Sequence, residues 1–389
     1  MTILLNKNLK KIQQPPIVKL KNMAKPFMGE PDFIDLSQAV PSYPPPDVII
    51  QSIKQKLDER ESHIYTPDPG RVDLREALKN KFLKKNNIYS EIENIIVTAG
   101  ANQAYLMALM TFLNPGDEVI LLTPYYFNHH MAIIAAGGIP VEIELDSEKK
   151  FQLDIDKICS RITSKTKIIT IVTPGNPTGK VISETELRKL SEVVKDRNVM
   201  IISDETYEYF TPVTGPEKHF SIGSIPEIKN SVITIGSFSK TFSLTGWRVG
   251  YLHAEKKYID EMIKIQDLMI ICAPNLAQQA AMTGLLMADA WLEEKRDYIL
   301  KLTNWIKSNQ FSNPKFSIVS CGAFFAYIKH DFSMDSFLMC EKLMNKKKLL
   351  CIPGEVSGKS QRNFFRIAVG GMNILQLESA FERINEFSG

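Results

Sequence analysis

Short hydrophobic runs alternate with longer amphipathic stretches from about residue 50 to 280. The runs are rich in β-branched residues, which favours strands. We expect strands at 95–100, 118–124, 139–145, 167–174, 199–206, 231–239 and 248–254. Helical spacing lies between them, as at 102–113 and 183–197, and Ser183 with Glu186 forms a capping box before the second of these helices. This alternation predicts an α/β fold, with a mainly parallel sheet covered by helices on both faces.

The two ends of the chain have different patterns. A long helical pattern at about 276–310 precedes strand patterns near 317–329 and 364–371. The first 45 residues contain Pro41 and end in a proline run, Pro44–Pro46, that continues one residue further. They predict an extended arm because proline is excluded from helix interiors and central strands. A chain of 389 residues is long enough for two domains. We expect an arm with part of a small domain (1–45), a large domain (46–280) and a small C-terminal α+β domain (281–389).

Composition excludes several classes of function. The net charge is +3 and no long basic run is present, so we expect no nucleic-acid partner. The opening apolar run is too short for a signal peptide, and no stretch is long enough for a transmembrane helix. The cysteines are scattered without a Cys-x-x-Cys pair, which is typical of a reduced, cytoplasmic protein. The adjacent pair His129 and His130 does not have metal-ligand spacing, so we expect no metal site.

The segment 237–251, SFSKTFSLTGWRVGY, contains the first candidate for catalysis. A single lysine is usually a solvated side chain, but Lys240 follows an apolar run and lies beside Ser237 and Ser239, with Arg248 further on. Pyridoxal phosphate needs this combination, because its aldehyde requires an amine and its phosphate requires hydroxyls, backbone N–H groups and an arginine. Burial would lower the pKa of such a lysine and make it a nucleophile and base near neutral pH.

A carboxylate ends the strand pattern in ISDETYEYF, residues 202–210. Asp204 would lie at the carboxyl end of a strand, where ligands bind in open α/β sheets. One interpretation is a helix N-cap. The other is an anionic partner for a pyridine nitrogen, which keeps that nitrogen protonated and makes the ring an electron sink. Tyr207 could reach the ring hydroxyl from the same turn.

Two loops after strands could complete such a site. In TPGNPTGKV, residues 173–181, a loop held by proline and glycine could direct the Asn176 amide at a ring oxygen. Gly100, Ala101 and Asn102 lie between a strand and a helix, so the first amides of that helix could receive a phosphate. An ordinary strand–helix loop is the alternative for this second segment.

In their order along the chain, these motifs resemble the class I/II aminotransferases, pyridoxal-phosphate enzymes of fold type I, from about residue 30 to 385. The specific pattern is Ser-x-Ser-Lys, five residues, then Gly-x-Arg. The resemblance implies that Lys240 forms the Schiff base and moves a proton between Cα and C4′. It also implies that Asp204 contacts the pyridine nitrogen, and that Asn176 and Tyr207 bond to the ring 3′-oxygen.

The resemblance also implies roles in binding. The phosphate cup would comprise Gly100, Ala101, Asn102, Ser237, Ser239 and Arg248. Tyr126 would stack on the ring, with core packing as the alternative. Tyr65 would reach the phosphate of a neighbouring subunit, which makes the active unit a homodimer with shared sites. Arg366, within an apolar strand, would bind the substrate α-carboxylate through a planar fork.

The arm at 35–46 departs from the pattern of many family members, and Ala39 and Val40 would lie beside the substrate there. No second arginine for an acidic substrate side chain is evident; Arg71 is a candidate, although a surface position suits it better. An aminotransferase acting with a 2-keto acid is the main hypothesis. The alternatives are a lyase or cyclase acting on a modified amino acid such as hydroxyarginine, and a ligand-sensing regulator, for which no DNA-binding module is evident. We do not predict which amino acid is the substrate.

Overall fold

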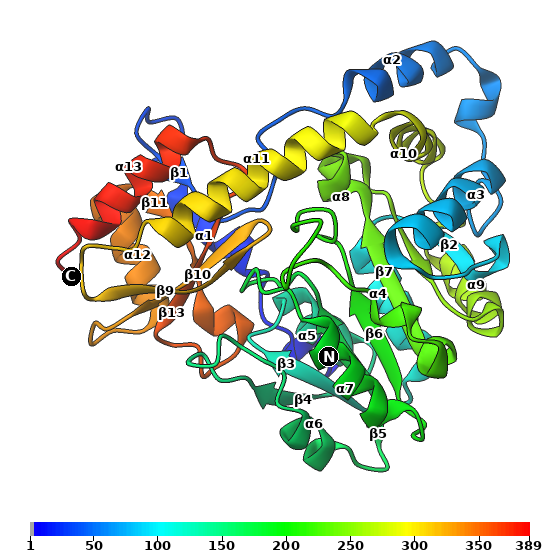
Figure 1. The fold of residues 1–389 in the computed structure, drawn as a ribbon, viewed down its shortest axis with the longest axis horizontal. Helices are drawn as coiled ribbons and strands as arrows, with labels where there is room; N and C mark the ends of the chain where they lie inside the picture. Colours follow the sequence, from blue (N-terminus) through cyan, green and yellow to red (C-terminus); the bar gives the residue numbers. More distant parts are fainter. Residues whose placement is uncertain (1–3) are drawn as a thin grey trace.

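A computed structural model describes residues 4–389 and places a seven-stranded sheet at the centre of the molecule, in the order β2-β8-β7-β6-β5-β3-β4 (Figure 1). Its neighbours pair in parallel except at β8, which runs antiparallel to β2 and β7. The mainly parallel sheet predicted from the sequence is confirmed. The strands are β2 (Ile95–Thr98), β3 (Glu118–Thr123), β4 (Ile139–Glu144), β5 (Thr166–Val172), β6 (Met200–Asp204), β7 (Val232–Ser237) and β8 (Gly250–His253).

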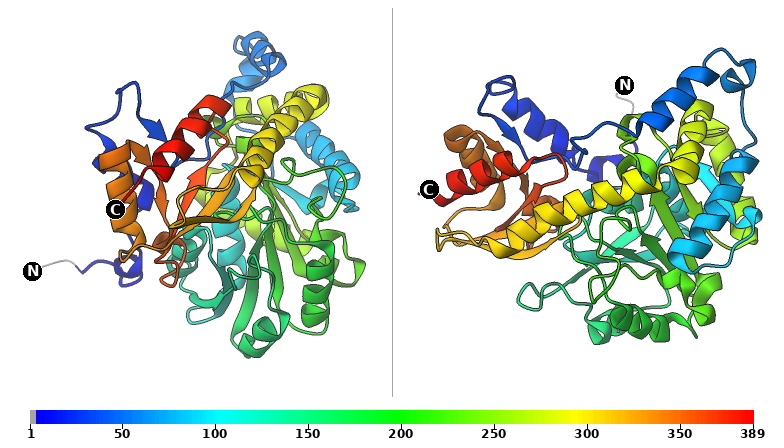
Figure 2. Two further views of the ribbon diagram at one scale, coloured as in Figure 1. Left: turned by 60° about the vertical axis from the view of Figure 1, so that its left-hand side comes forward. Right: turned by 45° about the horizontal axis from the view of Figure 1, so that its top comes forward.

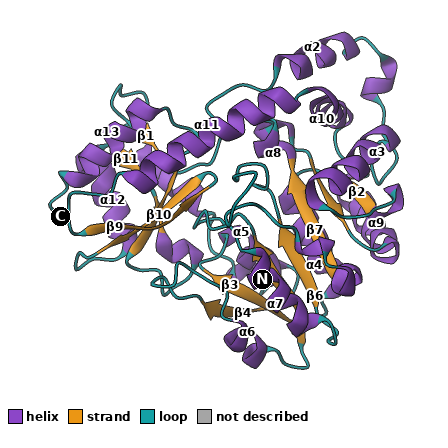
Figure 3. Ribbon diagram, viewed as in Figure 1, coloured by secondary structure: helices purple, strands orange, loops and turns teal. Residues whose placement is uncertain are grey.

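Helices cover both faces of this sheet (Figure 3). Alternate strand residues explain why: Ile120 and Ile169 pack with α6 and α7, whereas Val119 and Ile168 pack with α4, α5 and α9. Every residue of β6 and β7 is buried, as expected for strands covered on two sides. The helices are α4 (Ala101–Phe112), α5 (Phe127–Ala135), α6 (Ile155–Arg161), α7 (Glu184–Val194) and α9 (Lys256–Ile270).

The capping box before α7 is confirmed, because Ser183 N donates to Glu186 Oε2 at 3.0 Å and Glu186 N donates to Ser183 Oγ at 3.3 Å. The single long helix expected at 276–310 is wrong. The chain forms α10 (Asn275–Met287) and α11 (Asp289–Ser308), separated by Ala288 with φ −114° and ψ 21°. No helix in residues 4–389 combines the length and low polarity required to cross a bilayer.

Helix α10 packs beside the large sheet against α2 (Asp47–Lys56) and α3 (Val72–Lys81), and α11 extends from it toward a smaller sheet (Figure 1). The smaller sheet is antiparallel, in the order β12-β13-β10-β9. It packs with α11 and two C-terminal helices over a separate apolar core. The elements are β9 (Phe316–Gly322), β10 (Phe325–His330), α12 (Ser336–Lys347), β12 (Ile352–Pro353), β13 (Phe364–Ala368) and α13 (Ile374–Asn385).

The N-terminal segment lies against the smaller sheet rather than apart from it (Figure 2). Strand β1 (Ile34–Asp35) pairs with β11 (Leu349–Leu350), and Ser42 N donates to Gly370 O at 3.1 Å. The expectation of an extended arm over 1–45 is wrong in part, because residues 16–24 form α1 (Pro16–Ala24); the first three residues of that range lie outside the described part. A proline in the first helical turn lacks only an N–H that would be unpaired anyway, so Pro16 is compatible with this helix.

Candidate active site

A cavity of about 230 Å³ lies at the carboxyl ends of β5, β6 and β7. Parallel strands place their carboxyl ends at one edge, which is where open α/β sheets bind ligands. The cavity is lined by most of the residues that the motifs singled out: Ala101, Asn102, Tyr126, Asn176, Asp204, Tyr207, Ser237, Ser239, Lys240 and Arg248. Loops far apart in the sequence therefore meet here.

Lys240 lies on the short helix α8 (Phe238–Thr241), directly after β7. Its Nζ donates to the backbone carbonyl of Ala39 at 2.5 Å, which brings the N-terminal segment to the cavity. Burial, and then the cations Arg366 and Arg248, lower the pKa of Lys240 to about 8. A lysine with such a pKa is partly neutral near physiological pH, and the neutral amine is the nucleophile.

Asp204 is the last residue of β6, and its side chain is buried. Its Oδ1 accepts hydrogen bonds from Thr206 Oγ1 at 2.6 Å and Thr206 N at 3.1 Å, and its Oδ2 lies 3.3 Å from His129 Nε2. Burial raises the pKa of Asp204, but His129 and Thr206 outweigh it and hold the pKa below its ordinary value. The carboxylate is therefore ionised. No α-helix begins here among the described residues, so the helix N-cap alternative is wrong.

His129 is a site residue that the sequence analysis missed. It comes from α5, stacks on Tyr105 with ring centroids 3.9 Å apart, and faces Asp204, whereas His130 lies 3.5 Å from Glu142. Adjacent helical residues point in different directions. The spacing of His129 and His130 bears only on a metal site, and nothing in their local sequence indicates which carboxylate each histidine meets.

Arg366 lies on β13 and reaches the cavity from the smaller sheet. Its Nη1 donates to Asn176 Oδ1 at 2.8 Å, and its Nη2 donates to the carbonyl of Ser37. The buried Nε has no hydrogen-bond partner among the described residues. A buried guanidinium with an unpaired N–H is a binding group for an anion.

Tyr207 and Tyr126 present hydroxyl groups to the same space. Burial, and then Tyr126, raise the pKa of Tyr207, so its hydroxyl stays protonated and can donate a hydrogen bond. Tyr126 both lines the cavity and packs on a neighbouring apolar cluster, and its hydroxyl accepts from Asn128 Nδ2 at 2.8 Å. Tyr126 is therefore placed for both interpretations, and its stacking on the cofactor ring stays a prediction.

The N-terminus of α4 forms a cradle with Arg248. Gly100 has φ +87°, which favours glycine, and a Cβ built on it would lie 2.6 Å from Arg248 Nη2. Ser237 and Ser239 lie across the cavity, where Ser239 N donates to Ser237 Oγ at 3.2 Å. A helix N-terminus, a guanidinium and hydroxyls together suit a phosphate group.

Six of the residues singled out from the sequence do not line this cavity themselves. Three of them, Gly100, Ala39 and Arg366, contact residues that do. The other three are Tyr65, Val40 and Arg71. Tyr65 is 74% exposed and borders a second hollow of about 690 Å³. Val40 is exposed beside Ala39. Arg71 is paired with Asp73 at 2.6 Å, which agrees with a surface role rather than with a substrate arginine.

Comparison with known proteins decides the family. The family model described as Aminotransferase class I and II matches residues 31–384. The chain belongs to this family. The aspartate aminotransferase of Pyrococcus abyssi is 34% identical to it over 365 residues, covering 92% of each chain. The aromatic-amino-acid aminotransferase 2 of Thermococcus litoralis is 32% identical over 388 residues, covering 98% of this chain and 97% of the relative.

Solved structures agree with this membership. The aromatic aminotransferase from Pyrococcus horikoshii superposes with a TM-score of 0.85 at 32% identity, over 94% of this chain and 97% of that one. The aspartate aminotransferase from Thermus thermophilus with maleate superposes with a TM-score of 0.88 at 26% identity, over 99% of both chains. The expected fold type I and the aminotransferase activity are confirmed, and the lyase or cyclase alternative is not favoured.

The cofactor of this aminotransferase family is pyridoxal phosphate, and the residues of the cavity fit it. The Arg248 guanidinium lies so close to Gly100 that a side chain there would collide with it, which holds this cation at the N-terminus of α4, where the phosphate would bind. Lys240 supplies an amine whose pKa is about 8, and Asp204 supplies an ionised carboxylate. The unpaired Nε of Arg366 remains for a second anion.

Proposed function

We propose that this aminotransferase moves the α-amino group of an amino acid to a 2-keto acid, with Lys240, Asp204 and Arg366 as its central residues. When bound, pyridoxal phosphate supplies the aldehyde that accepts the amino group and a ring that withdraws electrons from Cα. The observation that carries the proposal is that an amine with its pKa near 8 and an ionised carboxylate line one cavity, with the buried Arg366 bonded to Asn176 of its lining.

Lys240 acts as the base that takes the Cα proton and returns it, because its amine is neutral above a pKa of about 8. Asp204 would supply the negative charge for the ring nitrogen of the cofactor, and His129 keeps that carboxylate ionised and in place. Tyr207, whose hydroxyl stays protonated, would donate a hydrogen bond to the ring oxygen, together with the Asn176 amide from the adjacent loop.

Arg366 binds the substrate α-carboxylate. A planar guanidinium held by Asn176 and Ser37 fixes the direction of its remaining donor. A carboxylate bound in this way would hold the substrate with its Cα–H bond directed toward Lys240, so that binding also aligns the reacting groups. We propose that Ala39 and its exposed neighbour Val40 would lie beside the bound substrate, since the Ala39 carbonyl contacts Lys240.

The relatives are named for aspartate and for aromatic amino acids, and we propose that the substrate belongs to one of these two classes. The test mixes holoenzyme with single amino acids of each class and follows the cofactor spectrum. Stable conversion to the amino form of the cofactor, reversed by a 2-keto acid, supports transamination. Product that accumulates from one amino acid with no requirement for a keto acid would contradict it and favour elimination or cyclisation.

We also propose that the active unit is a homodimer, in which Tyr65 reaches the phosphate site of the second copy. Tyr65 and Ile64 are exposed, and so is Leu268 at the end of α9. Exposed apolar residues of this kind mark protein–protein surfaces. A cytoplasmic location, proposed from the unpaired cysteines, agrees with the free thiols of the structure.

A further inference from the structure

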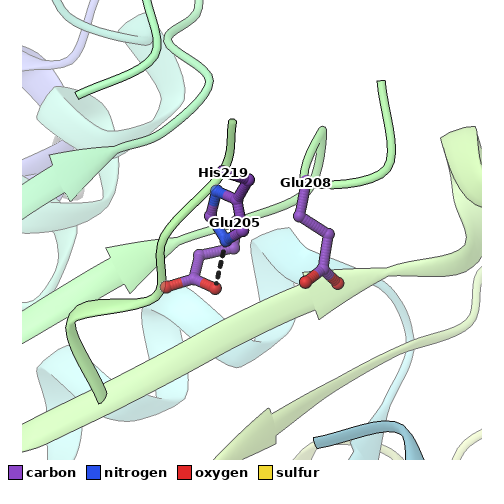
Figure 4. Close-up of side chains that lie close together, drawn as sticks. All are labelled: Glu205, Glu208 and His219. Carbon is purple, nitrogen blue, oxygen red and sulfur yellow. Dashed lines mark hydrogen bonds and ion pairs between the residues drawn. The ribbon is translucent and has the colours of Figure 1, made fainter. Parts of the chain in front are cut away.

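A buried polar network adjoins the turn that follows Asp204, and Figure 4 shows three of its side chains, Glu205, Glu208 and His219. We define this network as Lys81, Asn86, Glu205, Glu208, His219 and Tyr251. Its charged side chains are 5% exposed or less. Such burial is costly for two carboxylates unless each is paired and hydrogen-bonded. The network has no part in the roles proposed above, although Glu205 and Glu208 directly follow two residues that line the cavity.

Glu205 has both carboxylate oxygens occupied. Its Oε1 accepts from Ser203 Oγ at 2.9 Å and Ser221 Oγ at 2.8 Å. Its Oε2 accepts from Asn86 Nδ2 at 3.0 Å and lies 2.9 Å from His219 Nε2, the contact drawn in Figure 4. A carboxylate with this many partners is held in one orientation.

Glu208 is bound just as fully. Its Oε1 is paired with Lys81 Nζ and accepts from Tyr251 OH at 3.2 Å, while its Oε2 accepts from Asn86 Nδ2 at 2.7 Å. The Lys81 ammonium also lies over the Tyr251 ring, 5.0 Å from its centroid. Burial raises the pKa of Glu208, but Lys81, His219 and Lys85 together outweigh it and keep the carboxylate ionised.

A metal ion is the obvious alternative, because ligand atoms of Glu205, Glu208 and His219 lie within 4.8 Å of one another. The Lys81 ammonium, however, already provides the positive charge for Glu208, and the Asn86 amide bridges the two carboxylates. The unpaired atoms of the network, Asn86 Oδ1 and His219 Nδ1, are not the atoms that face the carboxylates. The geometry is that of a completed hydrogen-bond network rather than of a cation site.

We propose that Glu205 and Glu208 are positioning residues, which hold the turn so that Asp204 and Tyr207 keep their places toward the cofactor; this inference rests on the roles proposed for those two residues. Asp204 and Tyr207 line the cavity, whereas the adjacent Glu205 and Glu208 enter the network. The segment is not helical. Its backbone bonds include Glu205 N to Ile235 O at 2.8 Å and Glu208 N to Glu205 O at 2.9 Å.

The backbone of Asp204 is paired with β5 and β7, but the irregular turn that follows it has few backbone bonds. The buried side chains of the turn therefore help to determine its position. The network connects the turn to Lys81 at the end of α3, to Tyr251 on β8 and to His219 in the loop after the turn. Three separate segments therefore fix the side of the turn opposite the cofactor. A small displacement of Asp204 or Tyr207 would be sufficient to weaken catalysis.

The test uses Glu208→Gln and Glu205→Gln, which keep side-chain size and remove one charge. Two readouts do not depend on substrate: the dissociation constant of pyridoxal phosphate from the apoenzyme, and the midpoint at which the absorbance of the bound cofactor titrates with pH. We expect cofactor binding to weaken roughly 10- to 100-fold, the loss typical of one charge-assisted hydrogen bond, together with a shifted midpoint. Glu208→Gln leaves the Lys81 ammonium without its partner. The double variant Lys81→Met/Glu208→Gln removes that charge as well, so we expect it to recover part of the lost cofactor affinity and part of the midpoint shift.

A matched control is Ile158→Ala on α6, which is fully buried and lowers stability without touching the turn. It should keep the wild-type dissociation constant and midpoint. Wild-type values in both glutamine variants and in the double variant, despite lower unfolding temperatures, would overturn the proposal and leave the network a purely structural feature. If a single variant fails to fold, the double variant decides. Failure of the wild type to transaminate would instead count against the proposed function, since these readouts need no substrate.

Discussion

At Lys240, burial and two arginines act on a single amine. They lower its pKa from 10.5 to about 8 in the folded apoprotein. In the unfolded chain the amine returns to its ordinary pKa, so between these two values the unfolded state binds more protons than the folded one. Stability therefore rises with pH across that window, and the cost of burying a charged amine is fully present below it.

Replacing Lys240 by methionine tests this. At about pH 7 we expect apo Lys240→Met to unfold at a higher temperature than wild-type apoprotein, because the variant buries no charge. The difference should diminish as pH rises through the window between 8 and 10.5. Thermal unfolding across pH measures it. A constant difference at all pH values would contradict the depressed pKa, and a surviving lysine-bound cofactor band would contradict the role of Lys240.

Arg366 offers a second test at the scale of one residue. Arg366→Lys keeps the charge but loses the planar fork and the bond to Asn176. We expect KM for the amino acid to rise roughly 10- to 100-fold, the loss typical of one charge-assisted hydrogen bond. The cofactor dissociation constant should stay near wild type and serves as the control. An unchanged KM would remove Arg366 from the substrate site.

At the scale of elements, the loop 173–181 and the hairpin of β9 and β10 touch through two glycines. Gly179 has φ +69°, and a Cβ built on it would collide with the backbone of Gly322. This contact joins the loop that carries Asn176 to the smaller sheet, so it bears on the geometry of the site. Both residues in this contact are glycines that meet through backbone atoms, so no side-chain rotation can relieve a collision.

Gly179→Ala should destabilise the protein more than Gly215→Ala. Both glycines have positive φ, which costs an alanine about 1–2 kcal/mol. Gly215 has nothing within 4 Å of a built Cβ, so it carries the conformational cost alone. Urea unfolding should give the larger loss for Gly179→Ala, accompanied by a raised KM because Asn176 moves. Equal losses of unfolding free energy in the two variants would show that the backbone at Gly322 accommodates the alanine without cost, which would contradict this prediction.

At the scale of the whole molecule, the large sheet and the smaller sheet pack on distinct apolar clusters, although Tyr327 and Phe364 of the smaller sheet belong to a cluster of the large one. Arg366 of the smaller sheet joins the site through its bond to a residue of the cavity lining. We propose that these cores correspond to the two domains expected from the sequence. Tyr65 does not line the cavity of its own chain; it is exposed beside a different hollow. This exposure supports a second copy as its partner.

Mixing two defective variants tests the shared site. Lys240→Ala lacks the amine, and Tyr65→Ala lacks the proposed contact to the partner. A dimer formed from one copy of each contains one site with both residues intact, so activity at limiting cofactor should exceed the sum of the separate variants. Sedimentation gives the oligomeric state in parallel. Activity equal to that sum, or a monomer in solution, would contradict the proposed dimer.

The sequence by itself determined the features that depend on neighbours along the chain. The strands of the large sheet, the Ser183 capping box and the lysine motif each rest on local spacing, and the resemblance of their order to a family indicated the cofactor. The sequence did not predict the helix at Pro16–Ala24 or the break at Ala288. A weak amphipathic pattern and a single alanine carry no strong local signal.

Only the tertiary structure decided which side chains meet. His129 reaches Asp204, and Lys81 reaches Glu208, across long separations in sequence. Hydrogen bonding between distant segments leaves no periodicity or motif behind, since any donor brought to the carboxylate by the packing of helices and strands would satisfy it. Residue types and order therefore indicated the chemistry of the site, whereas the packing of separate elements set the charge and position of its groups.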